Sequence, residues 1–250
     1  MENIAPHSPL VEAVQADVAS LQTAQVQIKG MDWQVGAGDF WVIGGAHASG
    51  KSDLLATTAG LQKPAGGQFR IFGHDLYSLE EDELLKQRLR TGLVFKDGGR
   101  MFSHLTVAEN VALPLRYHSL HPESEIPAKV EELLEATGLP EFAKSTTATL
   151  GANWKQRVGL ARALALKPEL LLLDEPLAGL EPKHRRWWLD FLGQLSAAKT
   201  TLVIATNDVA PWSDTGNQFA LLRDQRWQVL GGRAELKNFN DLYDPAAEEN

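Results

Sequence analysis

The sequence contains no cysteine, which excludes disulfide bonds, thiolate metal sites and cysteine nucleophiles. It also lacks an excess of positive charge: 24 lysine and arginine residues stand against 32 aspartate and glutamate residues, and the formal net charge is −8. A general nucleic-acid-binding protein needs a basic face for phosphate contacts. We therefore expect no nucleic acid among the partners of this chain.

Long hydrophobic runs are absent as well. The most apolar stretch, LLLLDEP at 170–176, is far shorter than the roughly 20 residues of a membrane-spanning helix. The N-terminal MENIAPHSPLVEAV has neither the basic start nor the apolar centre of a secretory signal. These features predict a soluble cytoplasmic chain, with a flexible tail at 1–10 and an acidic tail at 241–250.

Hydrophobic residues nevertheless make up 44% of the 250 residues, enough for a substantial core. Strand patterns dominate from about residue 11 to 69, helix and loop patterns from 97 to 159, and strands alternating with helices return after that. Alternation of this kind is typical of an α/β fold with a mostly parallel sheet. The middle segment, 97–159, is predicted to be a helical insertion.

A phosphate-binding pattern occurs in DFWVIGGAHASGKSDLL, where four residues separate Gly45 from Gly50-Lys51-Ser52. It follows an apolar strand and opens a helix, so backbone N–H groups and the helix dipole can surround phosphate oxygens. Lys51 would reach the β and γ phosphates, and the Ser52 hydroxyl would bind Mg²⁺. The residues expected to bind the nucleotide here are Gly45, Ala46, His47, Ala48, Ser49, Gly50, Lys51, Ser52 and Asp53. His47 is interpreted as a variable loop position, not a catalytic one.

A second acidic motif follows the leucines of LLLLDEP. These leucines predict a buried central strand, and Asp174 and Glu175 leave its carboxyl end, where α/β folds place ligands. Asp174 is expected to hold Mg²⁺ together with Ser52, and Glu175 to act as general base on the attacking water. Two adjacent acids mean little alone, but with the phosphate loop they predict an ATP and Mg²⁺ site.

In these motifs the chain resembles the ATP-binding subunit of ABC transporters, from about Asp17 to Gly232. The matching segments stand in the family's order: GGAHASGKS, VFKDGGRMFSHLTVAENVALPL, LGANWKQRVGLARAL, LLLLDEPLAGLEP and TTLVIATND. The segment after VFK and KVEELLEATGL look most like the subfamily that drives MCE-type lipid transport across bacterial envelopes.

The resemblance implies a P-loop NTPase fold, with a RecA-like core at about 11–95 and 160–235. An N-terminal antiparallel β portion and an inserted helical subdomain at 97–159 would complete one domain over 11–240. Two such subunits, as a homodimer or heterodimer, would close head-to-tail around two ATP molecules. Closure would move integral membrane permease subunits, which places the chain on the cytoplasmic face of the inner membrane.

Several positions depart from the family pattern. The signature LSGGQ is replaced by LGANW; Gly151, Ala152 and Asn153 would face the ATP of the partner, and the bulk of Trp154 hinders close approach. The usual aspartate of GLDP is Glu181.

Two further departures fall at positions that the family uses in catalysis. Lys96 replaces a glutamine that binds Mg²⁺ and orients water, and as a donor it would contact a phosphate or pair with Glu175. Asn207 replaces the switch histidine. With Glu175, these two are the residues assigned to catalysis. No Phe, Tyr or Trp precedes Trp33, where the family has an aromatic residue that stacks on adenine, so adenine would be held loosely or by another part of the chain.

Two interpretations of function remain open. The retained Lys51, Ser52, Asp174 and Glu175 indicate an ATPase that couples hydrolysis to lipid or solute movement. The altered Lys96, Asn207 and LGANW positions favour a subunit that binds ATP and completes a dimer with little or no turnover. DNA-repair and chromosome ATPases are disfavoured by the acidic charge and by the lack of a long heptad segment.

The stretch KHRRWWLDFLGQL combines basic and aromatic residues. This composition occurs at membrane and nucleic-acid contacts, but its helical spacing favours a helix that packs on the sheet with a solvated basic edge. The seven histidines show no metal-ligand spacing, so Mg²⁺ is the one metal expected.

Overall fold

A computed structural model describes residues 9–119, 121–232 and 235. The predicted tail at 241–250, and all but the last two residues of the tail at 1–10, lie outside the described residues. Within the described part, no helix has both the length and the apolar character needed to cross a membrane.

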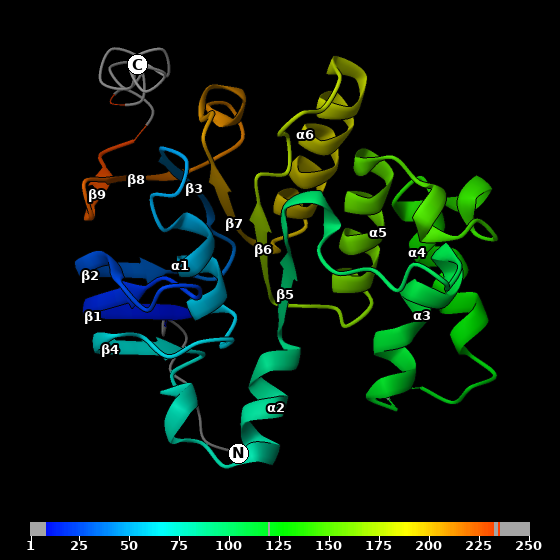
Figure 1. The fold of residues 1–250 in the computed structure, drawn as a ribbon, viewed down its shortest axis with the longest axis horizontal. Helices are drawn as coiled ribbons and strands as arrows, with labels where there is room; N and C mark the ends of the chain where they lie inside the picture. Colours follow the sequence, from blue (N-terminus) through cyan, green and yellow to red (C-terminus); the bar gives the residue numbers. More distant parts are fainter. Residues whose placement is uncertain (1–8, 120, 233–234, 236–250) are drawn as a thin grey trace.

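The architecture is built on one nine-stranded mixed sheet with the order β4-β1-β2-β9-β8-β3-β7-β6-β5 (Figure 1). Its strands are β1 (Val11–Ala19), β2 (Val26–Val35), β3 (Phe40–Gly45), β4 (Gly66–Ile71), β5 (Thr91–Val94), β6 (Leu170–Asp174), β7 (Thr201–Thr206), β8 (Gln218–Arg223) and β9 (Arg226–Leu230). Strands β5, β6, β7, β3 and β8 pair in parallel, whereas β4, β1 and β2 form an antiparallel portion. The predicted fold class is confirmed.

The helices are α1 (Lys51–Thr58), α2 (Glu81–Leu89), α3 (Val107–Tyr117), α4 (Ile126–Ala136), α5 (Ala152–Leu164) and α6 (Pro182–Ala197). Helices α3, α4 and α5 gather on the side of the molecule away from β1, β2 and β4 (Figure 1). They enclose an apolar cluster of their own, which includes Val111, Leu134 and Val158. Helix α5 continues past residue 159 and contacts β5, so it joins the helical region to the sheet.

Strand β6 explains the leucine run. Leu170 and Leu172 belong to one apolar cluster and Leu171 and Leu173 to another, so the strand is buried on both faces. A central parallel strand covered on both sides requires such a continuous apolar run. The same strand brings Asp174 to the end of the sheet where the phosphate loop lies.

The antiparallel and parallel portions meet at a weakly bonded seam between β2 and β9. Lys29 and Arg226 are the one register pair there, and the Lys29 N–H donates to the Gln225 carbonyl at 3.0 Å. Side chains reinforce the seam, because the rings of Trp33 and Trp227 lie 5.5 Å apart.

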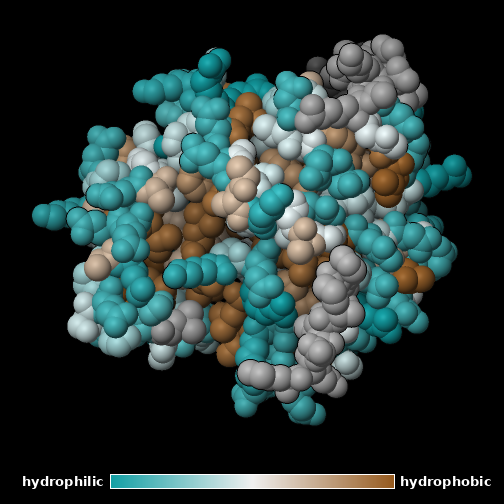
Figure 2. Space-filling view, turned by 180° about the vertical axis from the view of Figure 1, so that it is seen from behind, coloured by the Kyte–Doolittle hydropathy of each residue, from teal (hydrophilic) through white to brown (hydrophobic). Residues whose placement is uncertain are grey.

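Figure 2 shows the face of the molecule behind the view of Figure 1, where hydrophobic residues are visible in hollows among hydrophilic ones.

Candidate nucleotide-binding site

The phosphate loop depends on glycine at both of its ends. A Cβ on Gly45 would lie 2.6 Å from the Leu222 carbonyl oxygen, and one on Gly50 would lie 2.7 Å from Cβ of Gln27. Gly50 also has φ of 96°, a backbone conformation that other residues rarely adopt. The path of the loop from β3 into α1 therefore requires glycine at both positions, as in the sequence pattern.

Lys51 is buried inside this loop, with 5% of its surface exposed. Its Nζ donates to the carbonyl oxygens of Gly45 and Ala46 at 2.7 and 2.6 Å, and to Oδ1 of Asn207 at 2.8 Å. Ser49 Oγ lies 3.4 Å away. The ammonium group is thus surrounded by oxygen acceptors, which is the environment that phosphate oxygens provide.

Asp174 is oriented toward α1 at the end of β6. The Ser52 hydroxyl hydrogen-bonds its carboxylate, while Oδ1 is buried and finds no partner among the described residues. Burial raises the pKa of Asp174, against the opposing effects of Ser52 and Lys51. A hydroxyl beside a carboxylate with an unmatched buried oxygen fits a hard cation such as Mg²⁺.

These donors do not form a complete metal cage. In the ranges described, no three His, Asp or Glu side chains cluster around one point. Mg²⁺ commonly uses one or two protein oxygens and takes its remaining ligands from phosphates and water. The donor set therefore fits a cation that arrives with a nucleotide.

Glu175 has φ of 49°, a strained value for a residue other than glycine. Its N–H donates to the Ala205 carbonyl at 2.8 Å, which fixes the residue against β7. The Asn207 N–H and the Thr206 hydroxyl approach the carboxylate, the latter at 3.5 Å. Burial raises the pKa of Glu175, and a raised pKa brings a carboxylate closer to the proton affinity of a useful general base.

The predicted residues from His47 to Asp53 line one pocket of about 450 Å³ together with Lys96, Asp174, Glu175 and Asn207. The turn between β1 and β2, which the sequence did not predict as part of the site, also lines this pocket. Leu21 on this turn keeps 52% of its surface exposed, and its N–H donates to Asp53 at 2.8 Å. No ion pair between Lys96 and Glu175 exists among the described residues, so that predicted pairing is not formed.

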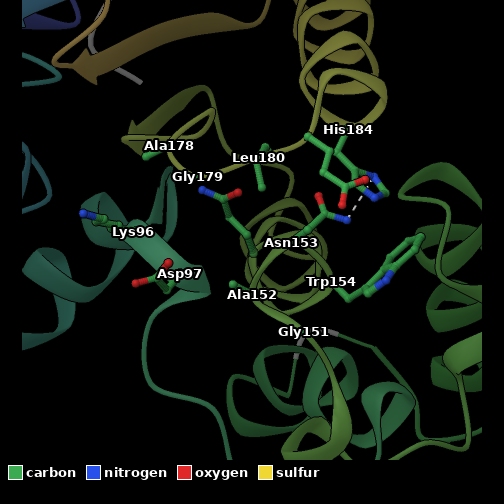
Figure 3. Close-up of a pocket in the computed structure, with 12 residues that line it drawn as sticks. Lys96, Asp97, Gly151, Ala152, Asn153, Trp154, Ala178, Gly179, Leu180 and His184 are labelled. Carbon is green, nitrogen blue, oxygen red and sulfur yellow. Dashed lines mark hydrogen bonds between the residues drawn. The ribbon is translucent and has the colours of Figure 1, made fainter.

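The altered signature lines a second pocket, of about 440 Å³, together with the segment 178–181, Lys96 and His184 (Figure 3). Gly151, Ala152, Asn153 and Trp154 all contribute to its lining. The Trp154 side chain points away from Lys96 and Ala178 (Figure 3). Gln156, which had not been predicted, links the two pockets, because its side-chain amide donates to the Glu175 carbonyl oxygen at 3.3 Å. Residues 47–53 and the signature residues therefore line two pockets that share Lys96, whereas Gly45 and Ala46 line neither of the two.

A phosphate loop between strand and helix, with an Asp-Glu pair at the end of a parallel strand two places away in the same sheet, defines a P-loop NTPase. Residues 28–178, more than half of the chain, match the family described as ABC transporter. The chain belongs to this family.

Named relatives support the assignment. The methionine import ATP-binding protein MetN of Lacticaseibacillus paracasei is 38% identical over 78% of this chain and 55% of its own length. The sulfate/thiosulfate import ATP-binding protein CysA of Mycolicibacterium paratuberculosis is 37% identical over 84% of this chain and 57% of its own length. The chain thus spans little more than half the length of these relatives.

Among solved structures, the ATP-binding cassette MJ0796, as a dimer bound to ADP and Pi, superposes with a TM-score of 0.79. The identity is 28%, over 89% of this chain and 99% of that one. The narrower resemblance to MCE-type lipid transporters is not shown by these proteins, since the two named relatives are importers of methionine and of sulfate or thiosulfate.

Proposed function

We propose that this chain is the ATP-binding subunit of an ABC transporter, and that it hydrolyses Mg-ATP at the interface with a second ATP-binding subunit. The observation that carries the proposal is the convergence of Lys51, the Ser52–Asp174 pair and Glu175 in one pocket. The family match supports the same conclusion.

The residues of the chain divide the work as follows. The phosphate oxygens of ATP replace the loop carbonyls as acceptors for Lys51, and backbone N–H groups of the loop hold the same phosphates. Ser52 and Asp174 would hold Mg²⁺, which would supply positive charge against the phosphates. Glu175 accepts a proton from the attacking water, and the Asn207 side chain, released from Lys51, donates to the γ-phosphate.

The nucleobase rests against the turn between β1 and β2. This turn lines the pocket together with the phosphate loop, and Leu21 is its large exposed apolar residue. An aliphatic side chain gives a purine a hydrophobic contact without the geometry of aromatic stacking. We therefore expect weak discrimination between ATP and GTP.

The second pocket receives the ATP of the partner subunit. Gly151 and Ala152 lie at the start of α5, where backbone N–H groups lack helical partners. The dimeric MJ0796 structure supports assembly of two such subunits. Integral membrane permeases would complete the complex at the cytoplasmic face of the membrane, and the names of both relatives favour import of a small solute.

The test is steady-state ATP hydrolysis by the purified chain, with Glu175→Gln as the matched control. We expect turnover to exceed that of the control by about 10²–10³, the usual effect of removing a transition-state group. Lys51→Ala should abolish ATP binding in calorimetry, and tight binding by this variant would refute the site.

A second candidate function survives one outcome of the test. If ATP binds but turnover equals that of Glu175→Gln, the chain either is a nucleotide-gated structural subunit, the role that Lys96 and Asn207 favour, or needs its partner for hydrolysis. Repeating the assay with the membrane complex then separates a subunit that needs its partner from one that does not hydrolyse ATP.

A further inference from the structure

The first turn of α5 carries two large side chains. They would hinder close approach if they lay between the backbone of α5 and a phosphate of the partner's ATP. Asn153 and Trp154 follow Gly151 and Ala152 directly. Space is open beside Gly151, since an added Cβ would meet no atom within 4 Å. Asn153 and Trp154 both line the signature pocket, so the backbone can contact a nucleotide only while their side chains stay against the wall of the pocket.

His184, near the start of α6, holds the first of these side chains. Its Nδ1 lies 3.2 Å from Nδ2 of Asn153 and 3.4 Å from Nη2 of Arg157. Amide and guanidinium nitrogens only donate, so Nδ1 is the acceptor and the ring proton resides on Nε2. Figure 3 shows the Asn153 amide directed toward His184.

Trp154 is held by the same group of residues. Its ring lies 4.5 Å from Phe142 and 5.5 Å from His184, and the Arg157 guanidinium lies 4.9 Å from its centre. Arg157 also lies 3.6 Å from the ring of Trp187, and burial lowers its pKa to about 10, so it stays a cation between two indoles. This stack fixes Trp154 on the side of α5 away from Lys96.

We propose that His184 is a positioning residue that holds the side chains of Asn153 and Trp154 against the wall of the signature pocket, so that the backbone of Gly151 and Ala152 faces the nucleotide of the partner subunit. The proposal rests on the function proposed above. It explains how a signature that reads LGANW can still contact a phosphate.

The orientation of Asn153 depends on this one contact. Its Oδ1 is buried without a partner among the described residues, and its Nδ2 bonds to His184. Loss of the histidine acceptor leaves both ends of the amide unmatched, which costs free energy until the side chain rotates. Asn153 already forms part of the lining of the pocket, so a rotated side chain can enter it.

The experiment measures ATP-driven dimerisation by analytical ultracentrifugation in a Glu175→Gln background, which retains bound ATP. Four further changes are compared: His184→Ala, His184→Asn, Asn153→Ala with His184→Ala, and His74→Ala as a control histidine distant from both pockets. The asparagine of His184→Asn keeps an acceptor at the δ position, which matches Nδ1. Calorimetry of ATP binding and thermal unfolding check that each variant is folded and has a working phosphate loop.

We expect His184→Ala to raise the ATP concentration for half-maximal dimerisation about tenfold, the effect of losing one hydrogen bond of ordinary strength. His184→Asn should restore most of this loss, and removing the Asn153 side chain should make His184→Ala harmless. His74→Ala should behave as the parent protein.

Two results overturn the proposal. If His184→Ala dimerises at the same ATP concentration as the parent, the contact between His184 and Asn153 does not affect the dimer. The proposal also fails if His184→Ala weakens dimerisation, His184→Asn weakens it equally, and adding Asn153→Ala to His184→Ala does not restore it. His184 would then have a general structural role. If the Glu175→Gln parent neither binds ATP nor dimerises, the proposed function fails, and the positioning role fails with it.

Discussion

Asp174 is a carboxylate that the fold buries before any nucleotide is bound, with 7% of its surface exposed. Burial raises its pKa above the ordinary value, despite Ser52 and Lys51. A carboxyl whose pKa rises on folding destabilises the folded state once the pH exceeds that value, because the unfolded chain holds the charge at less cost. The nucleotide-free protein is therefore less stable at neutral pH than its packing allows.

We predict that Asp174→Asn stabilises the nucleotide-free protein at pH 7 by about 1 kcal/mol, or roughly 2–4 °C in melting temperature for a chain of this size. The same change should remove the additional stabilisation that Mg²⁺ gives in the presence of ATP. Differential scanning calorimetry with and without Mg²⁺ measures both effects, and Asp214→Asn serves as a carboxylate control outside the pocket. A lower melting temperature for Asp174→Asn would contradict the burial argument.

Lys96 lowers the pKa of Glu175 through its charge, although burial dominates and the net shift is upward. Replacing it by glutamine removes a cation and restores a carbonyl that can orient water. We predict that Lys96→Gln shifts the acid limb of kcat/KM to higher pH and raises turnover at pH 8 by about tenfold. A pH–rate profile of both proteins tests this, and an acid limb displaced to lower pH would refute the assigned direction.

At the scale of elements, the hairpin that joins β8 to β9 is built without glycine. Arg223 pairs with Arg226 across a two-residue turn, and both turn residues, Asp224 and Gln225, have positive φ values of 49° and 63°. Such turns prefer glycine at the second position because other residues adopt this conformation at a cost. The turn therefore stores strain at the edge of the seam.

We predict that Gln225→Gly stabilises the protein by about 0.5–1 kcal/mol, after allowance for the entropy that glycine adds to the unfolded chain. Urea unfolding at constant pH measures the change, and Gln218→Gly in the β8 strand should be destabilising instead. Equal effects of the two substitutions would show that backbone strain at Gln225 is not relieved.

The hairpin also shows where sequence reasoning fails. The pattern of four leucines finds β6, because burial on both faces leaves an unbroken apolar run. RDQRWQVL has no glycine or alternating pattern, so neither the turn nor β9 is visible in it. Helix α6 is confirmed as a helix packed on the sheet, since Trp188 and Leu192 are fully buried in the cluster around it.

The residues of the site also fall into those that the sequence predicts and those that it does not. Phosphate-loop and acidic residues could be predicted because their chemistry fixes their spacing along the chain. Leu21, Gln156 and His184 could not, because each reaches the site through the fold from a segment without a motif. The turn between β1 and β2 carries no motif, yet Ser20 to Thr23 and Gln25 line the pocket.

At the scale of the whole molecule, the nucleotide pocket is assembled from both portions of the sheet. The turn at Leu21 belongs to the antiparallel portion, whereas Lys51, Asp174 and Asn207 belong to the parallel portion. A nucleotide that contacts both portions binds only to the folded protein. Its binding free energy should therefore appear directly as stability.

We predict that Mg-ATP at 100 times its dissociation constant stabilises the Glu175→Gln protein by about 2.7 kcal/mol, or roughly 5–10 °C. Lys51→Ala in the same background should show no shift, because it removes the phosphate-binding cation. Thermal unfolding at several ATP concentrations measures the effect, and a shift retained by Lys51→Ala would place the nucleotide elsewhere.

The seam between β2 and β9 has a consequence for motion. Because one backbone pair joins the two portions, the amide of Lys29 should exchange with deuterated solvent through a local opening, well before the amides of β6 or β7. Bound ATP would contact both Leu21 and Lys51 and so hold the two portions of the sheet together. The exchange of the Lys29 amide should then become slower. Hydrogen–deuterium exchange across residues 26–35 should therefore be fast when the nucleotide site is empty and slow when ATP is bound.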